Sequence, residues 1–245
     1  MKYLLLLLSF NLLAKTFESG KTQVKLLELY TSQSCSSCPP AENWLNQFYK
    51  SNFLWKKVVP VAYHVTYWNH LSWEDQFSKE EFSAKQRKYS SITGSGVYTP
   101  QFVLAGKDYR NWRHKSLRDT INSNEEVGNL KAIISEKGKV KIEFTPNAKL
   151  NIEYLVCNMA FIINNQTTKV KSGENAGETI SQNFITKEWK ASSAKKSQNK
   201  FLCEFDIPNL QYDSIAFWVM NPKTQEVIQA AGGHLSQDSH TIQSN

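Results

Sequence analysis

The chain has 245 residues, of which 40% are hydrophobic and 12% aromatic, and its formal net charge is +7. This composition suits one large or two small folded domains with a core of ordinary size. Neither an internal repeat nor a heptad run is found, which excludes a repeat array and a coiled coil. The basic residues are scattered, so we predict no nucleic acid partner and attribute the charge to solubility and some attraction to anionic envelope surfaces.

The N-terminus has the pattern of a secretory signal peptide. One lysine, Lys2, precedes the apolar run from Leu4 to Ala14, which has about half of the ~20 residues that a membrane helix needs. We predict cleavage after Ala14, so that residues 1–14 are removed; a retained N-terminal anchor is the alternative. The sequence thus predicts a periplasmic or secreted protein without a transmembrane segment, in a compartment where cysteines tend to pair.

A cysteine pair follows the first predicted strand, residues 24–30. After Cys35-Ser36-Ser37-Cys38, apolar residues recur with the period of one helical stripe. They are Ala41, Trp44, Leu45, Phe48 and Tyr49. Pro39 and Pro40 suit the first turn of a helix, because backbone N–H groups there have no helical partner. We therefore expect the pair to cap a helix that follows a buried strand.

Further elements of the N-terminal part alternate between strand and helix. We predict a strand over 58–65, a helix over 78–91, a strand after Thr99-Pro100 that ends near Gly106, and a short helix over 116–122. A CxxC pair at a helix N-terminus, together with a proline directly before a later strand, is the order of parts in a thioredoxin-like domain. We assign this domain to residues 21–125.

Residues 126–245 show mainly strand patterns. Apolar and polar residues alternate over 139–146 and 201–207, and apolar runs cover 150–163, 214–220 and 227–230. The lysine-rich stretch 187–200 is predicted to be a mobile loop. The expected fold class is therefore α/β: a thioredoxin-like domain followed by an antiparallel β-sandwich domain. Cys157 and Cys203 lie on apolar faces of this second domain, where they either form a structural disulfide or remain buried free thiols.

Five stretches resemble an uncharacterised family of secreted, thioredoxin-like bacterial proteins, a domain-of-unknown-function family. The stretches are ELYTSQSCSSCPPAE (28–42), AYHVTYWNHLSW (62–73), QRKY (86–89), VYTPQFVLAG (97–106) and SGENAGETI (172–180). Two departures are evident, because the family usually has glycine at the position of Ser34 and acidic residues at those of Thr66 and Asn69. The resemblance implies a fold more than an activity.

The cysteines are the predicted reactive groups. Cys35, at the exposed start of the helix, is expected to be the attacking thiolate, because the helix dipole and nearby N–H groups favour its charged form. Cys38, one turn further on, is expected to resolve the mixed disulfide. The alternative is an inert structural disulfide, although so short a ring stabilises a fold poorly.

The resemblance to thioredoxins adds two further catalytic candidates. Glu28 is a carboxylate in an apolar strand, close to where thioredoxins keep a buried acid that exchanges protons with the inner cysteine; an ordinary ion pair is the alternative. Pro100, preceded by Thr99, resembles the cis-proline that faces the active cysteines and presents backbone to a substrate. A turn proline without a function is the alternative.

Aromatic and histidine side chains near the second strand are candidates for substrate binding. His64 and Tyr67 come at the strand's carboxyl end and are expected to border the redox site, although His64 also fits a core histidine. Trp68, with other aromatic residues, suits a rim for an unfolded polypeptide, or simply a core. We predict no metal site, because the remaining histidines show no ligand spacing.

The sequence favours an exported thiol–disulfide oxidoreductase without a cofactor. Its predicted partners are protein or small-molecule thiols and disulfides, and a redox partner protein. One alternative is a copper metallochaperone that uses Cys35, Cys38 and His64 as ligands, although the chain has only three methionines. Another is a non-catalytic envelope protein whose sandwich domain binds a partner or a glycan.

Overall fold

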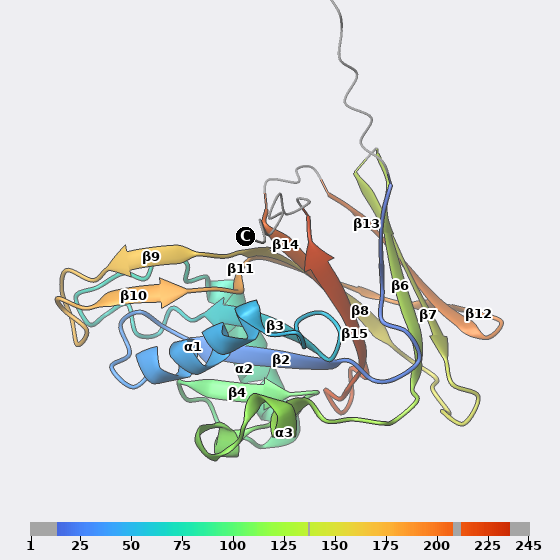
Figure 1. The fold of residues 1–245 in the computed structure, drawn as a ribbon, viewed down its shortest axis with the longest axis horizontal. Helices are drawn as coiled ribbons and strands as arrows, with labels where there is room; N and C mark the ends of the chain where they lie inside the picture. Colours follow the sequence, from blue (N-terminus) through green and yellow to red (C-terminus); the bar gives the residue numbers. More distant parts are fainter. Residues whose placement is uncertain (1–13, 137, 208–211, 236–245) are drawn as a thin grey trace, which may run out of the picture.

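The structure of the protein is a computed structural model that describes residues 14–136, 138–207 and 212–235. Within these residues, the strands form an eight-stranded mixed sheet, a five-stranded antiparallel sheet and a separate hairpin (Figure 1). The large sheet has the order β15-β14-β8-β11-β3-β2-β4-β5, and the smaller sheet has the order β1-β6-β7-β13-β12. The hairpin consists of β9 and β10, which lie beside α1 (Figure 1).

The bounds of the elements are as follows. The helices are α1 (Pro39–Asn46), η1 (Gln47–Lys50), α2 (Glu80–Thr93), η2 (Arg110–His114) and α3 (Leu117–Ile121). The strands of the large sheet are β2 (Lys25–Thr31), β3 (Val58–His64), β4 (Gln101–Leu104), β5 (Lys107–Asp108), β8 (Val156–Ile163), β11 (Ile185–Ser193), β14 (Ser214–Met220) and β15 (Val227–His234). The other strands are β1 (Lys15–Glu18), β6 (Gly128–Ile134), β7 (Lys139–Pro146), β9 (Gln166–Lys169), β10 (Thr179–Gln182), β12 (Lys195–Ser197) and β13 (Lys200–Asp206).

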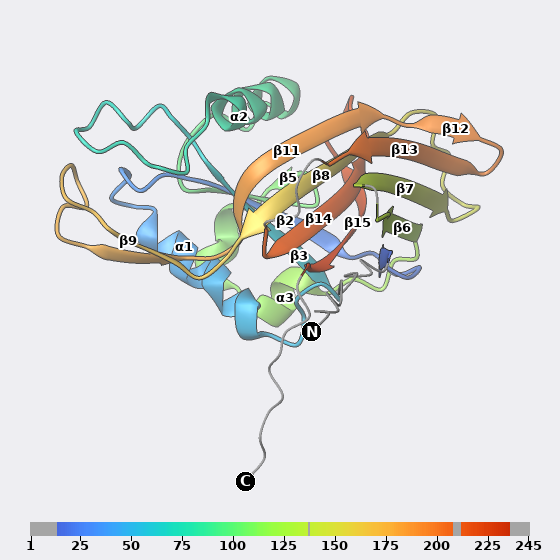
Figure 2. The same ribbon diagram turned by 90° about the horizontal axis from the view of Figure 1, so that it is seen from above.

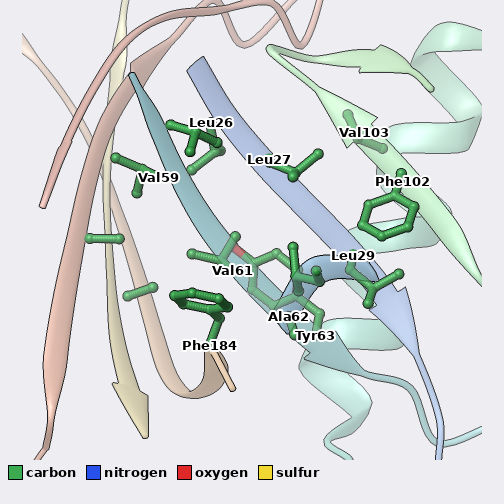
Figure 3. Close-up of a cluster of buried hydrophobic side chains, with 14 of the residues drawn as sticks. Leu26, Leu27, Leu29, Val59, Val61, Ala62, Tyr63, Phe102, Val103 and Phe184 are labelled. Carbon is green, nitrogen blue, oxygen red and sulfur yellow. The ribbon is translucent and has the colours of Figure 1, made fainter. Parts of the chain in front are cut away.

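Helices α1 and α2 cover opposite faces of the large sheet (Figure 2). On one face, Trp44 of α1 packs edge-on against Phe102 of β4, and on the other Phe82 of α2 packs against Tyr63 of β3. Strands β2 and β3 are parallel and buried on both faces, which explains their nearly continuous apolar sequences. Figure 3 shows part of this core, in which Phe184, directly before β11, lies among side chains of β3.

A second core lies between the five-stranded sheet and β8, β14 and β15. Its largest fully buried members include Phe144 of β7, Phe161 of β8 and Phe217 of β14. A disulfide between Cys157 of β8 and Cys203 of β13 joins the two sheets across this core. Of the two alternatives left open by the sequence, the structural disulfide is therefore the one observed.

The predicted fold class is wrong. The chain is mostly β, and it does not form a thioredoxin-like α/β domain followed by a separate antiparallel sandwich. Strand β11, from the C-terminal half, pairs in parallel with β3 and antiparallel with β8, so that strands from both halves form one mixed sheet. Strand β1 likewise pairs with β6, and the paired residues range from Glu18 with Lys131 to Lys15 with Ile134. These pairings join strands that are distant in the chain, and local sequence patterns do not encode them.

Two local predictions are also corrected. The lysine-rich stretch 187–200 is not a mobile loop, because it forms most of β11, all of β12 and the start of β13. Its charged residues suit strands whose outer faces are partly exposed, such as β11 after Thr186. The strand predicted over 150–163 is shorter, since β8 begins at Val156.

The predicted signal peptide falls almost entirely outside the described residues, which begin at Ala14. Strand β1 begins at Lys15, directly after the predicted cleavage point. Within the described ranges, no helix has the length and apolar character needed to cross a membrane.

Removing the disulfide should destabilise the protein. The bond closes a loop between residues separated by 46 positions, so its loss restores chain entropy to the unfolded state. We expect the Cys157→Ala/Cys203→Ala double variant to lose about 2–4 kcal/mol of unfolding free energy, measured by denaturant titration. A reductant should then shift the midpoint of the variant much less than that of the wild type. Equal midpoints for the two proteins would contradict this expectation.

Candidate functional site: the Cys35–Cys38 pair

The cysteine pair lies in the connection between β2 and α1. Cys38 is the residue before the helix, and Pro39 and Pro40 occupy its first turn, as predicted. The two Sγ atoms are 2.6 Å apart and are not joined by a disulfide. Both residues are buried, and Cys35 is 2% exposed, so it is less accessible than its position at the start of the helix had suggested. Residues from other segments, among them Thr99 and Asn175, contact Cys35.

The surroundings of the two sulfurs shift their pKa values in opposite directions. The hydrogen bond donated by the Cys38 thiol lowers the pKa of Cys35 to about 6, against the opposing effect of burial, and bonds from Ser37 and Thr99 contribute further. Burial raises the pKa of Cys38, and its hydrogen bond to Cys35 raises it further. The pair therefore holds one thiolate at Cys35 and one protonated thiol at Cys38 at neutral pH.

Residues of two later segments contact the pair at Cys35. The Thr99–Pro100 peptide bond is cis, and Thr99 Oγ1 donates a hydrogen bond to Cys35 Sγ at 3.2 Å. Trp68 Nε1 donates to Thr99 Oγ1 at 2.7 Å. Burial raises the pKa of Tyr67 to about 12, and the nearby Cys38 and Cys35 also raise it. The structure thus brings Thr99, Pro100, Trp68 and Tyr67 together with the cysteines.

Glu28 occupies a different environment. Its Oε1 atom accepts a hydrogen bond from Lys85 Nζ of α2 at 2.9 Å, and both side chains are largely buried. Lys85 also lies over the ring of Tyr63, on the face of the sheet that α2 covers. Glu28 therefore has the ion pair that was the alternative to a catalytic role.

Glu42 is the carboxylate beside Cys38, and sequence analysis missed it. Its Oε1 accepts a hydrogen bond from Thr31 Oγ1 at 2.7 Å, and the Thr31 side chain also hydrogen-bonds Cys38. Its Oε2 is buried without a hydrogen-bond partner, and burial raises the pKa of Glu42 to about 7. Its spacing in the sequence could have predicted this position, because Glu42 follows Cys38 by four residues and so lies about one helical turn further along the same face.

His64 lies beneath the site rather than at its border. It is 1% exposed, and its Nδ1 is 2.6 Å from Asp75 Oδ2. Burial opposes protonation of His64, but attraction to Asp75, the hydrogen bond with Asp75 and attraction to Glu42 together outweigh burial and raise the pKa of the imidazole. The same interaction lowers the pKa of Asp75, again against burial. The two groups form a buried ion pair, and His64 offers no exposed surface to a substrate.

A segment from the C-terminal half completes the surroundings of the pair. The β9–β10 hairpin reaches the residues before Cys35 through Gln33, whose Nε2 donates to Gln182 Oε1 at 2.7 Å and to Thr168 Oγ1 at 3.1 Å. Asn175, in the turn of the hairpin, donates to the carbonyl oxygens of Gln33 and Cys35. Apart from the family resemblance of residues 172–180, no local sequence pattern predicts this contact. Within the described ranges, no group of three or more His, Cys, Asp or Glu side chains is arranged to hold a metal ion.

Comparison with known proteins places the chain in a family. Residues 26–220 match the family described as "Protein of unknown function (DUF1223)", and the chain belongs to this family. A crystal structure of a protein from Agrobacterium tumefaciens is similar, with a TM-score of 0.64 and 22% identity, over 89% of this chain and 98% of that one. HBP35 of Porphyromonas gingivalis also has a TM-score of 0.64, with 13% identity over 91% of this chain and 79% of that one. At these identities the likeness concerns the fold alone. A search of curated proteins finds no match.

The low pKa of Cys35 is directly measurable. Alkylation of the reduced protein by iodoacetamide should follow the thiolate, with a midpoint near pH 6. Because the Cys38 thiol is the largest contributor to this shift, Cys38→Ala should move the midpoint upward, toward the ordinary value of about 8.5. Cys35→Ser, as the control, should abolish the reaction near pH 6. An unshifted midpoint in Cys38→Ala would contradict the hydrogen bond as the cause.

Proposed function

We propose that the protein is a thiol–disulfide oxidoreductase that uses Cys35 and Cys38. The observation that carries this proposal is the pairing of two sulfurs 2.6 Å apart with opposite pKa shifts. A thiolate is the reactive form of cysteine, so Cys35 reacts first. The neighbouring protonated thiol of Cys38 reacts in the second step, after it has lost its proton. The S–S bond of a disulfide is ~2.05 Å long, so the two Sγ atoms need to move only a short distance to form one.

The first half of the reaction uses the Cys35 thiolate. It attacks one sulfur of a substrate disulfide, forms a mixed disulfide through Cys35 Sγ, and releases the other substrate sulfur as a thiolate that takes a proton from water. The hydrogen bond from Cys38 to Cys35 is lost in this step, because Cys35 no longer carries the negative charge. Thr99, in contact with Cys35 Sγ, and Trp68 behind it border the position of the incoming substrate.

The second half requires deprotonation of Cys38. The Cys38 thiol passes its proton to Thr31 Oγ1, while the Thr31 hydroxyl gives its own proton to the Glu42 carboxylate. The Cys38 thiolate then attacks Cys35 Sγ, the protein disulfide forms, and the second substrate thiolate leaves. A carboxyl group with a pKa of about 7 exchanges protons readily at neutral pH, which suits this role. In reverse, the same steps reduce the protein and oxidise a dithiol.

Export to the periplasm or the medium is part of the proposal. Two features support it: the signal-peptide pattern that precedes β1, and the Cys157–Cys203 disulfide, which is typical of an oxidising compartment. The partners of the reaction are protein or small-molecule thiols and disulfides, together with a redox partner protein that restores the starting state.

Single cysteine variants should behave asymmetrically. Cys38→Ser should accumulate mixed disulfides through Cys35, because the resolving thiol is missing, whereas Cys35→Ser should accumulate almost none. The variants are expressed in an exporting host and quenched with acid, and free thiols are then blocked. Non-reducing gels and mass spectrometry of the bands provide the measurement. Equally empty lanes, together with no reaction of the wild type with small disulfides, would show that the pair does not turn over.

Glu42→Gln should slow the resolving step. In the wild type, the rate of protein disulfide formation should rise as pH passes through about 7, where Glu42 becomes a carboxylate able to accept the Cys38 proton. In the variant, this rise should be absent and the rate at pH 8 should fall about 10-fold or more, measured by stopped-flow thiol loss under single turnover.

Glu28→Gln is the matched control for this experiment. It removes a buried carboxylate of the same kind from the other face of the sheet, where it pairs with Lys85. We expect lower stability, because Lys85 loses its partner, but the same pH profile as the wild type. If the pH profile changed in Glu28→Gln but not in Glu42→Gln, Glu28 rather than Glu42 would be the residue that accepts the Cys38 proton.

A further inference from the structure

The turn of the β9–β10 hairpin, residues 170–178, touches the residues around the cysteines from outside. The backbone N–H of Ser36 donates a hydrogen bond to Glu174 Oε2 at 3.1 Å. Asn175 Nδ2 donates to Gln33 O at 2.9 Å and to Cys35 O at 3.0 Å. This turn of the C-terminal half is therefore built against the residues before and between the two cysteines.

Several contacts hold the turn in place. Gly173 has a φ of +79°, and a Cβ atom there would lie 2.6 Å from the carbonyl oxygen of Leu71, so glycine alone permits this approach. The hydroxyl of Ser172 donates to the carbonyl oxygen of Ser72. Asn175 is 6% exposed, and both of its hydrogen bonds are buried. The backbone on both sides of Glu174 is therefore held in position by Gly173 and Asn175, and this fixes where the Glu174 side chain begins.

Glu174 brings a negative charge to the surface beside Cys35. Its side chain is exposed, and the hydrogen bond from Ser36 lowers the pKa of its carboxyl group, which is ionised at neutral pH. Ser36 follows Cys35 directly and is itself exposed. The side chain of Thr99, which hydrogen-bonds Cys35 Sγ and accepts a hydrogen bond from Trp68, is uncharged. A substrate sulfur that reaches Cys35 therefore comes close to an ionised carboxylate, while the Thr99 side chain bonded to Cys35 adds no charge.

We propose that Glu174 is a specificity-determining residue that selects thiol and disulfide substrates by charge. It favours sulfurs flanked by a cationic group and disfavours sulfurs flanked by carboxylates. The inference rests on the proposed oxidoreductase function and adds a substrate class to it. At separations of several ångströms near a protein surface, one unit charge on the substrate changes the rate by about 3- to 10-fold, and salt reduces the effect.

Three small disulfides test this selectivity, because they differ in charge near the sulfur atoms. Cystamine is cationic, 2-hydroxyethyl disulfide is neutral and dithiodiglycolate is anionic. The rate of thiol loss from the reduced full-length protein is measured with each disulfide, at low and at high salt. The readout is the ratio of the cystamine rate to the dithiodiglycolate rate, compared between variants, so that intrinsic differences among the reagents cancel.

The variants are Glu174→Gln, which keeps an oxygen acceptor for Ser36, and Glu174→Lys. We expect the ratio to fall about 10-fold in Glu174→Gln and further in Glu174→Lys, while the rate with 2-hydroxyethyl disulfide stays within about 2-fold of the wild type. Glu178→Gln is the matched control, because it removes the same charge from an exposed position in the same turn. It should change the ratio less than Glu174→Gln does.

Two results would overturn the selectivity while leaving the oxidoreductase function intact. One is an unchanged ratio in Glu174→Gln and Glu174→Lys. The other is an equal loss of rate with all three disulfides, which would mean that Glu174 acts only on the geometry of the cysteine segment. Failure of the wild type to react with any of the three is a different result: it would overturn the selectivity, and together with equally empty lanes in the trapping experiment it would overturn the proposed function as well.

Discussion

The parallel pairing of β11 with β3 is the constraint on which the rest of the structure depends. It is a short junction: Ile185 aligns with Ala62, and the Ala62 N–H donates to the carbonyl oxygen of Phe184 at 2.7 Å. This junction makes one sheet from strands of both halves of the chain. It also fixes the point at which the β9–β10 hairpin, which ends just before β11, joins the large sheet. The hairpin is thereby directed over α1 (Figure 1), and Asn175 in its turn hydrogen-bonds the backbone of Gln33 and Cys35.

The chemistry of the cysteine pair follows from burial combined with a single shared proton. Burial disfavours a charge on either sulfur, but the Cys38 thiol donates its hydrogen to Cys35 and so favours charge there alone. Beneath the pair, burial also raises the pKa of Glu42, to about 7. His64 and Asp75 beside it carry opposite charges, which compensate each other. One buried region thus holds a proton acceptor beside a satisfied ion pair.

The difference between Glu28 and Glu42 illustrates what sequence reasoning missed. Both are buried carboxylates, but only Glu28 interrupts an apolar strand in the sequence, whereas Glu42 stands in the first turn of a helix, where acidic residues are common. Glu28 attracted the catalytic interpretation because of its distance along the chain from Cys35. Its side chain nevertheless points to the α2 face, where Lys85 neutralises it. The face to which a strand residue points depends on the pleat and on what covers each face, and neither is visible in a linear spacing.

By itself, the sequence determined the local elements around the site: the strand before the cysteines, the proline-started helix after them, and the strand that follows Pro100. These depend on short-range patterns, namely the 3.6-residue period of a helix, the β-branched strands and the conformational limits of proline. Only the tertiary structure decided the mixed sheet, the place of Glu42 beneath Cys38, and the contact of residues 174 and 175 with the cysteine segment. The physical reason is that each of these depends on packing between surfaces far apart in the chain, where no local preference chooses the partner.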